Sequence, residues 1–279
     1  MHSKAHRAEI QETGELSPWR PQPGRFTRED LVEAMLEARC AGPACSHDRP
    51  NVLWKIKRLV EGEPVDQFGL TGLTSFTRDE VLAMVAEEAG FNPDPSLHRG
   101  DVPIDPWRVL AACEAAGERL ALATERGERV VLATGHPAGL ILLYLEVGRL
   151  LEERGADVLR PALGFNWREM ERYREISYLH GVAVQTDRAG TLHTHGAGPM
   201  QVMLQEARPD LVFADHGFAG AAIEAGIETI SIADVNDPAL VVAKHQGRTE
   251  IVIVMDDNVQ PDGYWPCFQA IAAKFDSGS

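Results

Sequence analysis

The sequence of 279 residues carries a formal net charge of −15 at pH 7. Its hydrophobic content of 44% and charged content of 25% are ordinary for a globular protein and exclude a disordered chain. The acidic balance also excludes a nucleic-acid partner, because proteins of that class present a basic surface. Small anionic ligands are still compatible with it where a local cation, metal ion or helix N-terminus neutralises them.

The N-terminal segment, residues 1–24, is polar and closes with several prolines and a glycine. This composition predicts a flexible arm and not a signal peptide. The longest apolar run, residues 138–145, is too short to cross a membrane. The four cysteines have no CxxC or zinc-ribbon spacing and indicate reduced thiols, with a ligand pair of Cys40 and Cys45 as the alternative. We therefore expect a cytoplasmic protein that does not bind membranes.

Residues 25–124 are predicted to form a helical subdomain. They contain two similar helix starts, in each of which a threonine precedes a carboxylate by three residues. The pairs are Thr27 with Asp30 and Thr77 with Glu80, and both predict a capping box at a helix N-terminus.

Two further helices are expected in this subdomain. Residues 52–60 have helical periodicity, and residues 106–116 begin with a proline and are followed by Gly117. Proline is favoured in the first turn of a helix and glycine just past its end, so the second helix is expected to stop before Gly117.

Residues 125–279 have a different pattern and are predicted to form an α/β catalytic domain. Short apolar runs alternate there with helical stretches, which is typical of a doubly wound, largely parallel sheet. The segment 181–195 is expected to form an inserted antiparallel hairpin. Strands are expected at residues 130–135, 157–159, 181–185, 191–195, 211–214, 229–233 and 250–255.

Charged and polar side chains follow several of the expected strands. In sheets of this class, ligands bind just beyond the carboxyl ends of the strands. A single Asp or Asn there could cap a helix, but several buried carboxylates repel one another unless a cation joins them. The sequence therefore predicts a divalent cation, Mg²⁺, Mn²⁺ or iron. Its predicted ligands are Asp215, Asp234, Asn236 and Asp257.

The turn after the first expected strand, TGHPAG over residues 134–139, leads directly into a helix. Backbone N–H groups of such a turn, that of Gly135 among them, would face an anionic substrate. His136 is a candidate to contact a phosphate oxygen or to protonate the leaving group, and His216 is a second candidate acid. Asp215 is the third catalytic candidate. A packed turn with a solvated histidine is the structural alternative.

Two further groups of residues are predicted to bind the substrate. His193 and His195 lie two apart on an expected strand, so both rings would share one face and could hold an anion or a metal. Arg49, Asn51 and Lys55 belong to a basic stretch that could bind the substrate's anionic group. Idle histidines on an exposed hairpin and a solvated helix face are the respective alternatives.

Several segments together resemble an actinobacterial family of phosphatases, some of whose members accompany genes for nucleoside-antibiotic biosynthesis. The similarity extends over about residues 25–268 and includes the stretches ATGHPAG, LHTH, ADHGFAGAAIEAGI, ADVNDPAL, DDNVQP, RPNVLWKIKRL and DQFGL. The resemblance implies a phosphomonoesterase. It does not by itself indicate which residues hold a metal.

These features together predict a metal-assisted phosphatase that acts on a small phosphorylated substrate, such as a nucleotide intermediate of secondary metabolism. The sequence has no DxDxT-like loop for an aspartyl-phosphate route, so attack by water is expected. A transferase that processes nucleosides or nucleotide sugars and a non-enzymatic small-molecule-binding protein are the alternatives. The sequence is compatible with a homodimer.

Overall fold

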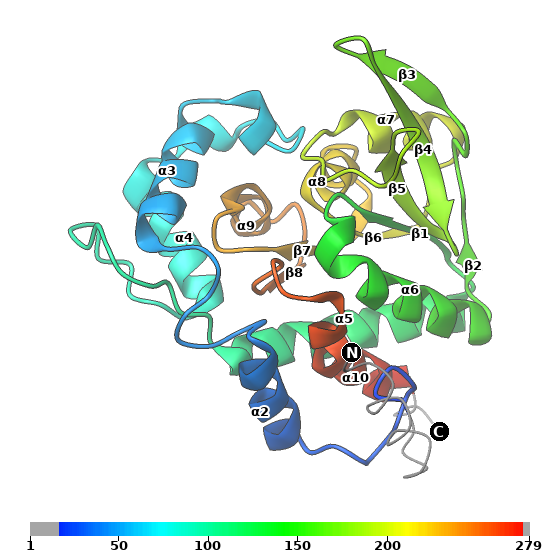
Figure 1. Cartoon of the computed structure of the whole chain (residues 1–279), viewed down its shortest axis with the longest axis horizontal. Helices are drawn as coiled ribbons and strands as arrows, with labels where there is room; N and C mark the ends of the chain where they lie inside the picture. The colour runs from blue at the N-terminus through cyan, green and yellow to red at the C-terminus, as the bar shows by residue number, and fades with distance from the viewer. Residues whose placement is uncertain (1–16, 276–279) are drawn as a thin grey trace, which may run out of the picture.

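The structure is a computed structural model that describes residues 17–275, in which helices cover both faces of one central sheet (Figure 1). The strands are β1 (Arg129–Thr134), β2 (Asp157–Val158), β3 (Asn166–Glu169), β4 (Arg172–Leu179), β5 (Val182–Thr186), β6 (Leu211–Asp215), β7 (Glu228–Ala233) and β8 (Ile251–Val254).

The helices fall into an N-terminal set and a set that alternates with the strands. The first comprises α2 (Arg28–Ala38), α3 (Arg49–Val60), α4 (Arg78–Ala89) and α5 (Pro106–Arg126), with the short 3-10 helices η1 (Pro64–Asp66) and η2 (Leu73–Ser75). The second comprises α6 (Pro137–Glu153), α7 (Gly198–Glu206), α8 (His216–Glu224), α9 (Pro238–His245) and α10 (Trp265–Ala272), with η3 (Pro261–Tyr264) and η4 (Ala273–Phe275).

The sheet has the strand order β3-β4-β5-β1-β6-β7-β8, with β2 paired to β1 outside that path. Strands β5, β1, β6, β7 and β8 run parallel to one another, whereas β3 and β4 add an antiparallel edge. Helices α5, α6 and α10 pack on one face, and α8 and α9, with α7 beside α8, pack on the other. The predicted α/β class with a largely parallel sheet is confirmed.

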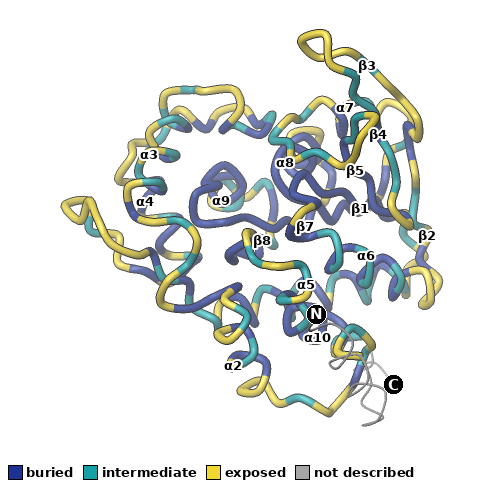
Figure 2. Tube along the Cα trace, in the orientation of Figure 1, coloured by how far each residue is buried: buried dark blue, intermediate teal, exposed yellow. Residues whose placement is uncertain are grey.

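One hydrophobic core extends through both the N-terminal helices and the sheet. Figure 2 shows the central strands, α8 and α9 buried, while the tip of the β3–β4 hairpin is exposed. Helix α2 packs against α10, and α3 and α4 pack against α9. The expected boundary at residues 124 and 125 falls inside α5, which contacts both β8 and α10.

The capping boxes predicted for α2 and α4 are confirmed. The amide of Asp30 donates to Thr27 Oγ1 at 3.1 Å, and the amide of Thr27 donates to Asp30 Oδ2 at 2.8 Å. Thr77 and Glu80 form the same reciprocal pair, at 3.3 and 2.7 Å. Each box satisfies two backbone N–H groups that have no partner within the helix.

Two expectations about the elements were wrong. Helix α5 continues past Gly117, because this glycine lets the helix approach the backbone of α10: a Cβ there would lie 2.4 Å from the carbonyl oxygen of Ile271. The hairpin expected over residues 181–195 is wrong beyond its turn, where the amide of Leu192 donates to the carbonyl oxygen of Gln185 at 2.8 Å. Strand β5 pairs with β4 and β1, and beyond a single bridge between Thr186 and Thr191 the chain is irregular.

Most of the predicted N-terminal arm, residues 1–16, lies outside the described residues. The described part is packed and not free: Gln269 Nε2 on α10 donates to the carbonyl oxygens of Pro18 and Arg20, each at 2.6 Å. Trp19 also contacts the ring of Phe268 at a centroid distance of 5.7 Å. Among the helices within residues 17–275, none is long and apolar enough to span a bilayer.

The capping geometry of α4 leads to a stability prediction. Thr77→Ala removes the side-chain acceptor of the box and should lower the free energy of unfolding by about 1 kcal/mol. Glu87→Ala, on the exposed side of the same helix, is the control and should change it by less than about 0.5 kcal/mol. Denaturant unfolding measures both, and equal effects would show that the box contributes nothing.

Candidate functional site

The carboxyl ends of β1, β6, β7 and β8 meet at one edge of the sheet, because these strands are adjacent and parallel. The residues that follow them are charged or titratable, yet each is at most 6% exposed. They are His136 after β1, Asp215 and His216 at the junction of β6 and α8, Asp234 and Asp237 after β7, and Asp257 after β8.

His216 lies at the centre of this group. Its Nδ1 is 2.8 Å from Asp215 Oδ1, and its Nε2 is 3.1 Å from Asp237 Oδ2 and 3.7 Å from Asp257 Oδ2. The backbone of His216 has a φ of 46°, in the left-handed region that side chains other than glycine rarely adopt. Strain of this kind is typical of functional sites, where it aims one side chain.

The segment that carries His193 and His195 approaches the sheet edge very closely. The amide of Thr194 donates to the carbonyl oxygen of Gly135 at 2.8 Å. A Cβ at Gly135 would lie 2.4 Å from the Thr194 carbonyl oxygen, and one at Gly217 would lie 2.3 Å from that of His195. Glycine is needed at both positions because the two backbones touch there.

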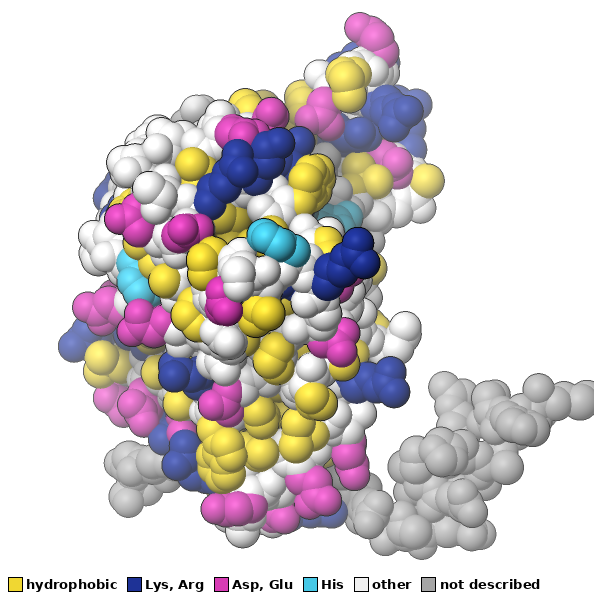
Figure 3. All heavy atoms as spheres, turned by 90° about the vertical axis from the view of Figure 1, so that its left-hand side faces the viewer, with side chains coloured by type: hydrophobic (Ala, Val, Ile, Leu, Met, Phe, Trp, Pro, Cys, Tyr) yellow, Lys and Arg dark blue, Asp and Glu magenta, His cyan; other side chains and the backbone are white. Residues whose placement is uncertain are grey.

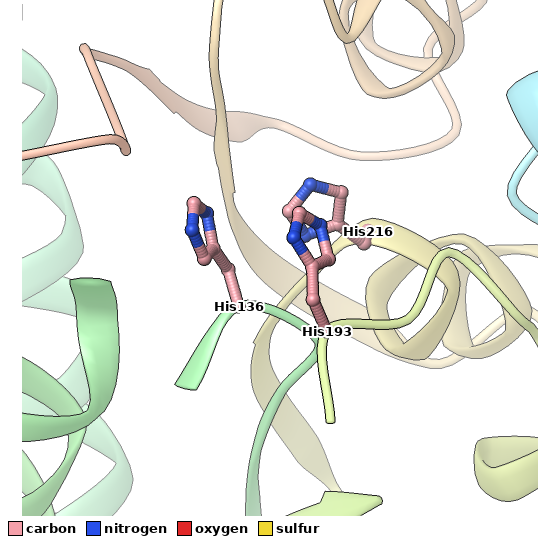
Figure 4. Close-up of side chains that lie close together, drawn as sticks. All are labelled: His136, His193 and His216. Atoms are coloured by element: carbon pink, nitrogen blue, oxygen red, sulfur yellow. The ribbon is translucent and has the colours of Figure 1, made fainter. Parts of the chain in front are cut away.

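This approach places four imidazole rings together. His136, from the turn after β1, His193, from the irregular segment, and His216, from the start of α8, point into the same space (Figure 4). The rings of His136 and His193 are stacked with centroids 4.4 Å apart, and those of His195 and His216 at 4.6 Å. Nε2 of His193 is 3.1 Å from Nε2 of His195.

The carboxylates give these imidazoles different proton affinities. Burial opposes the charge on His216, but Asp237 and Asp215 raise its pKa well above the ordinary value. Burial likewise opposes the charge on His136, and Asp257 shifts the balance so that its pKa is raised. Burial and the charge of His216 lower the pKa of His195 to about 3. These imidazoles therefore differ in how strongly their surroundings favour a bound proton.

The surroundings of Asp234 disfavour its charged form. Burial and the carboxylates of Asp257, Asp256 and Asp237 raise its pKa well above the ordinary value. Its Oδ2 atom is buried and accepts no hydrogen bond from residues 17–275, and the nearest basic group, His47 Nε2, is 3.5 Å away. Asp256 is satisfied instead by the amide and hydroxyl of Ser46, at 2.6 and 2.7 Å.

Three groups of side chains within residues 17–275 bring possible metal-ligand atoms within 4.8 Å of one another. They are His136 with His193 and His216, His195 with His216 and Asp237, and His47 with Asp234 and Asp257. Their nitrogen and oxygen donors suit divalent transition metals such as Mn²⁺, Fe²⁺ and Zn²⁺.

The predicted metal ligands have different surroundings. Asp234 and Asp257 share one of the three groups, whereas Asp215 belongs to none of them. Asp215 Oδ1 accepts the amide of Gly135 at 2.7 Å and faces His216, so this N–H is not free for an anion. Asn236 Nδ2 donates to Asn51 Oδ1 at 3.0 Å, which connects the loop after β7 to α3.

The predicted basic residues of α3 are mostly paired within the protein. The guanidinium group of Arg49 donates to the carbonyl oxygens of residues 92, 94 and 97, which is a structural role. Lys55 Nζ is 2.8 Å from the buried carboxylate of Asp66, but its charge still lowers the pKa values of His195 and Asp237. Figure 3 shows Lys and Arg among acidic and hydrophobic side chains on this side of the molecule.

Sequence reasoning did not assign His47 and Asp237 to the site. Asp237 was visible as the last residue of the DVND stretch after β7, where it resembles an ordinary helix-capping residue. His47 was visible only as the first residue of the basic stretch at α3, and its contact with Asp234 could not be predicted because the two residues are far apart in the chain.

Buried imidazoles and carboxylates at the carboxyl edge of a parallel sheet define an enzyme-like site for a small polar ligand. The chain belongs to the Phosphatase family, whose sequence profile matches residues 26–277. It is 34% identical over 255 residues to phosphatase SCO2771 of Streptomyces coelicolor, across 88% of this chain and 94% of that protein. The resemblance to a phosphatase family is confirmed. A link to nucleotides or antibiotic biosynthesis stays a prediction.

The close approach at Gly217 leads to a second prediction. Gly217→Ala would force its Cβ against the backbone of the segment that carries His195, at a separation that atoms do not tolerate. We expect this overpacking to lower the free energy of unfolding by about 1–3 kcal/mol. Gly198→Ala is the matched control, since a Cβ at Gly198 meets nothing within 4 Å.

Denaturant unfolding of both variants checks this expectation. The NMR resonances of His193 and His195 should also move in Gly217→Ala and stay in place in Gly198→Ala. An unchanged stability and unchanged histidine resonances in Gly217→Ala would mean that the segment does not rest on this glycine.

Proposed function

We propose that this protein hydrolyses a phosphate monoester of a small molecule in the cytoplasm, with a divalent cation bound by His47, Asp234 and Asp257. Membership of the Phosphatase family supports the reaction class. The arrangement of these three side chains, whose ligand atoms lie within 4.8 Å of one another, supports the position of the cation.

The environment of Asp234 is the observation that carries the proposal. Its side chain is fully buried, its Oδ2 accepts no hydrogen bond from residues 17–275, and Asp257 lies close by. A buried carboxylate is costly unless a partner of opposite charge neutralises it. A divalent cation would neutralise Asp234 and Asp257 together. One imidazole and two carboxylates suit Mn²⁺ or Fe²⁺ better than Mg²⁺.

Such a cation would polarise a phosphate oxygen and lower the pKa of an attacking water. The chain's own residues would supply the remaining functions. His136 is buried beside Asp257, with 3.2 Å between Nδ1 and Oδ2. We propose that His136 gives a proton to the leaving oxygen, and that Asp215 orients His216 instead of binding the metal.

The substrate class is a further part of the proposal. The resemblance to phosphatases found beside nucleoside-antibiotic genes favours a nucleotide intermediate of secondary metabolism. Lys55, whose charge acts on His195 and Asp237, would attract the anionic substrate without taking part in bond cleavage. Because a charge that acts alike on substrate and transition state affects binding, Lys55→Ala should mainly raise KM.

The metal dependence provides the direct test. Phosphate release from a panel of nucleoside monophosphates and sugar phosphates should stop after chelation and return with Mn²⁺ or Fe²⁺. Asp234→Asn should lower kcat/KM at least about 100-fold, because it removes a charged ligand of the cation. Asp262→Asn, an exposed carboxylate, is the control and should retain normal activity. Full activity in the chelated protein would overturn the proposal.

The role of His136 is tested by varying the leaving group. A general acid typically contributes a factor of about 10²–10⁴ to the rate, and it matters most for leaving groups that are poor without a proton. His136→Ala should therefore lower turnover of an alkyl phosphate by about 100-fold or more and affect p-nitrophenyl phosphate much less. The exposed residue His98 provides the control variant, His98→Ala. Equal losses on both substrates would assign His136 to binding and not to proton transfer.

A further inference from the structure

We infer that a second divalent cation binds His195, His216 and Asp237, directly beside the cation proposed at His47, Asp234 and Asp257. The catalytic use of this second cation rests on the proposed function, whereas its binding follows from the side-chain geometry. The ligand atoms of the three residues lie within 4.8 Å of one another.

His216 is oriented as metal-bound histidines are. Its Nδ1 faces Asp215 Oδ1 at 2.8 Å, so a proton on Nδ1 would donate to this carboxylate and make Nε2 the ligand atom, on the side that faces Asp237 Oδ2 at 3.1 Å. Asp215 is fixed in turn by the amide of Gly135, at 2.7 Å. A carboxylate that orients a histidine in this way is the usual outer partner of a metal ligand. The strained backbone at His216 serves the same orientation.

The two groups of ligands that contain His216 are alternatives for one site. Both need its Nε2, because Nδ1 is held by Asp215. Asp237 favours the group with His195, since it brings a negative charge 3.1 Å from Nε2. Dications are held more strongly by a set that includes a carboxylate than by neutral imidazoles alone.

The rings of His136 and His193 stack on each other at 4.4 Å, and His136 Nδ1 faces Asp257 Oδ2 at 3.2 Å without forming a hydrogen bond within residues 17–275. His193 also contacts the proposed site, because its Nε2 is 3.1 Å from Nε2 of His195. His195 is held against His216, with stacked centroids at 4.6 Å, and the edge of Phe68 supports its ring at 5.1 Å. The Nδ1 atom of His195 is buried without a hydrogen-bond partner among residues 17–275.

The two cation sites are neighbours. Asp257 belongs to the first group, and its Oδ2 is also 3.7 Å from Nε2 of His216 in the second. The amide of Asp237 donates to the carbonyl oxygen of Asp234 at 2.9 Å, so one short turn supplies a ligand to each site. Pairs of cations about 3.5–4 Å apart stabilise the attacking and leaving oxygens in phosphoryl transfer. The arrangement here suits such a pair.

Manganese binding to the purified full-length chain tests this inference. After chelation, reconstitution with Mn²⁺ and desalting, elemental analysis should find about two Mn²⁺ per chain in the wild type. Electron paramagnetic resonance should show that the two ions are magnetically coupled. His195→Ala and Asp237→Asn should each retain about one ion and lose the coupling. Asp234→Asn should also retain about one, through loss of the other site.

Two control variants sharpen the result. His193→Ala, from the same segment as His195, should keep both ions, and so should His98→Ala on the surface. One ion per saturated wild-type chain would overturn the inference, as would loss of the second ion in His193→Ala but not in Asp237→Asn. Where a variant does not fold, the number of ions bound by the wild type and their magnetic coupling test the inference. Two coupled ions without phosphate release would support the second cation site and contradict the proposed function. Phosphate release with a single bound ion would support the proposed function and contradict the second site.

Discussion

The burial of carboxylates at one edge of the sheet is the constraint on which the site depends. Asp215, Asp234, Asp237 and Asp257 are each at most 4% exposed, and the effective cost of burying an unpaired charge is several kcal/mol. His216 contacts both Asp215 and Asp237, at 2.8 and 3.1 Å. Asp234 has no comparable partner within residues 17–275. This difference between neighbouring carboxylates is what points to a cation.

The backbone around the carboxylates brings the other residues of the site next to them. Glycines at 135 and 217 let the segment with His193 and His195 lie against the turns after β1 and β6. The N-terminal helices take part as well, since the chain before α3 brings His47 to Asp234. The N-terminal helical part therefore lines one side of the site. One hydrophobic core joins this part to the sheet.

The sequence was sufficient for features that depend on local chemistry or on a repeated pattern. The alternation of strands and helices predicted the parallel sheet, and the threonine–carboxylate spacing predicted the caps at Thr27 and Thr77. The sequence was not sufficient where contacts between distant segments determine the position of a residue. Close contacts at glycines position residues 193–195 without strand pairing. The guanidinium group of Arg49 donates to the carbonyl oxygens of residues 92, 94 and 97. Strands β3 and β4 were missed because their mixed polarity gives no clear alternation.

The central claim is that the carboxyl edge of the sheet binds a catalytic cation. A crystal of the protein grown with Mn²⁺ and phosphate, measured for anomalous scattering, tests it most directly. We predict strong anomalous density among His47, Asp234 and Asp257, with the phosphate beside it and His136 within hydrogen-bonding distance. Well-ordered phosphate in the site without anomalous density at these three residues would contradict the claim.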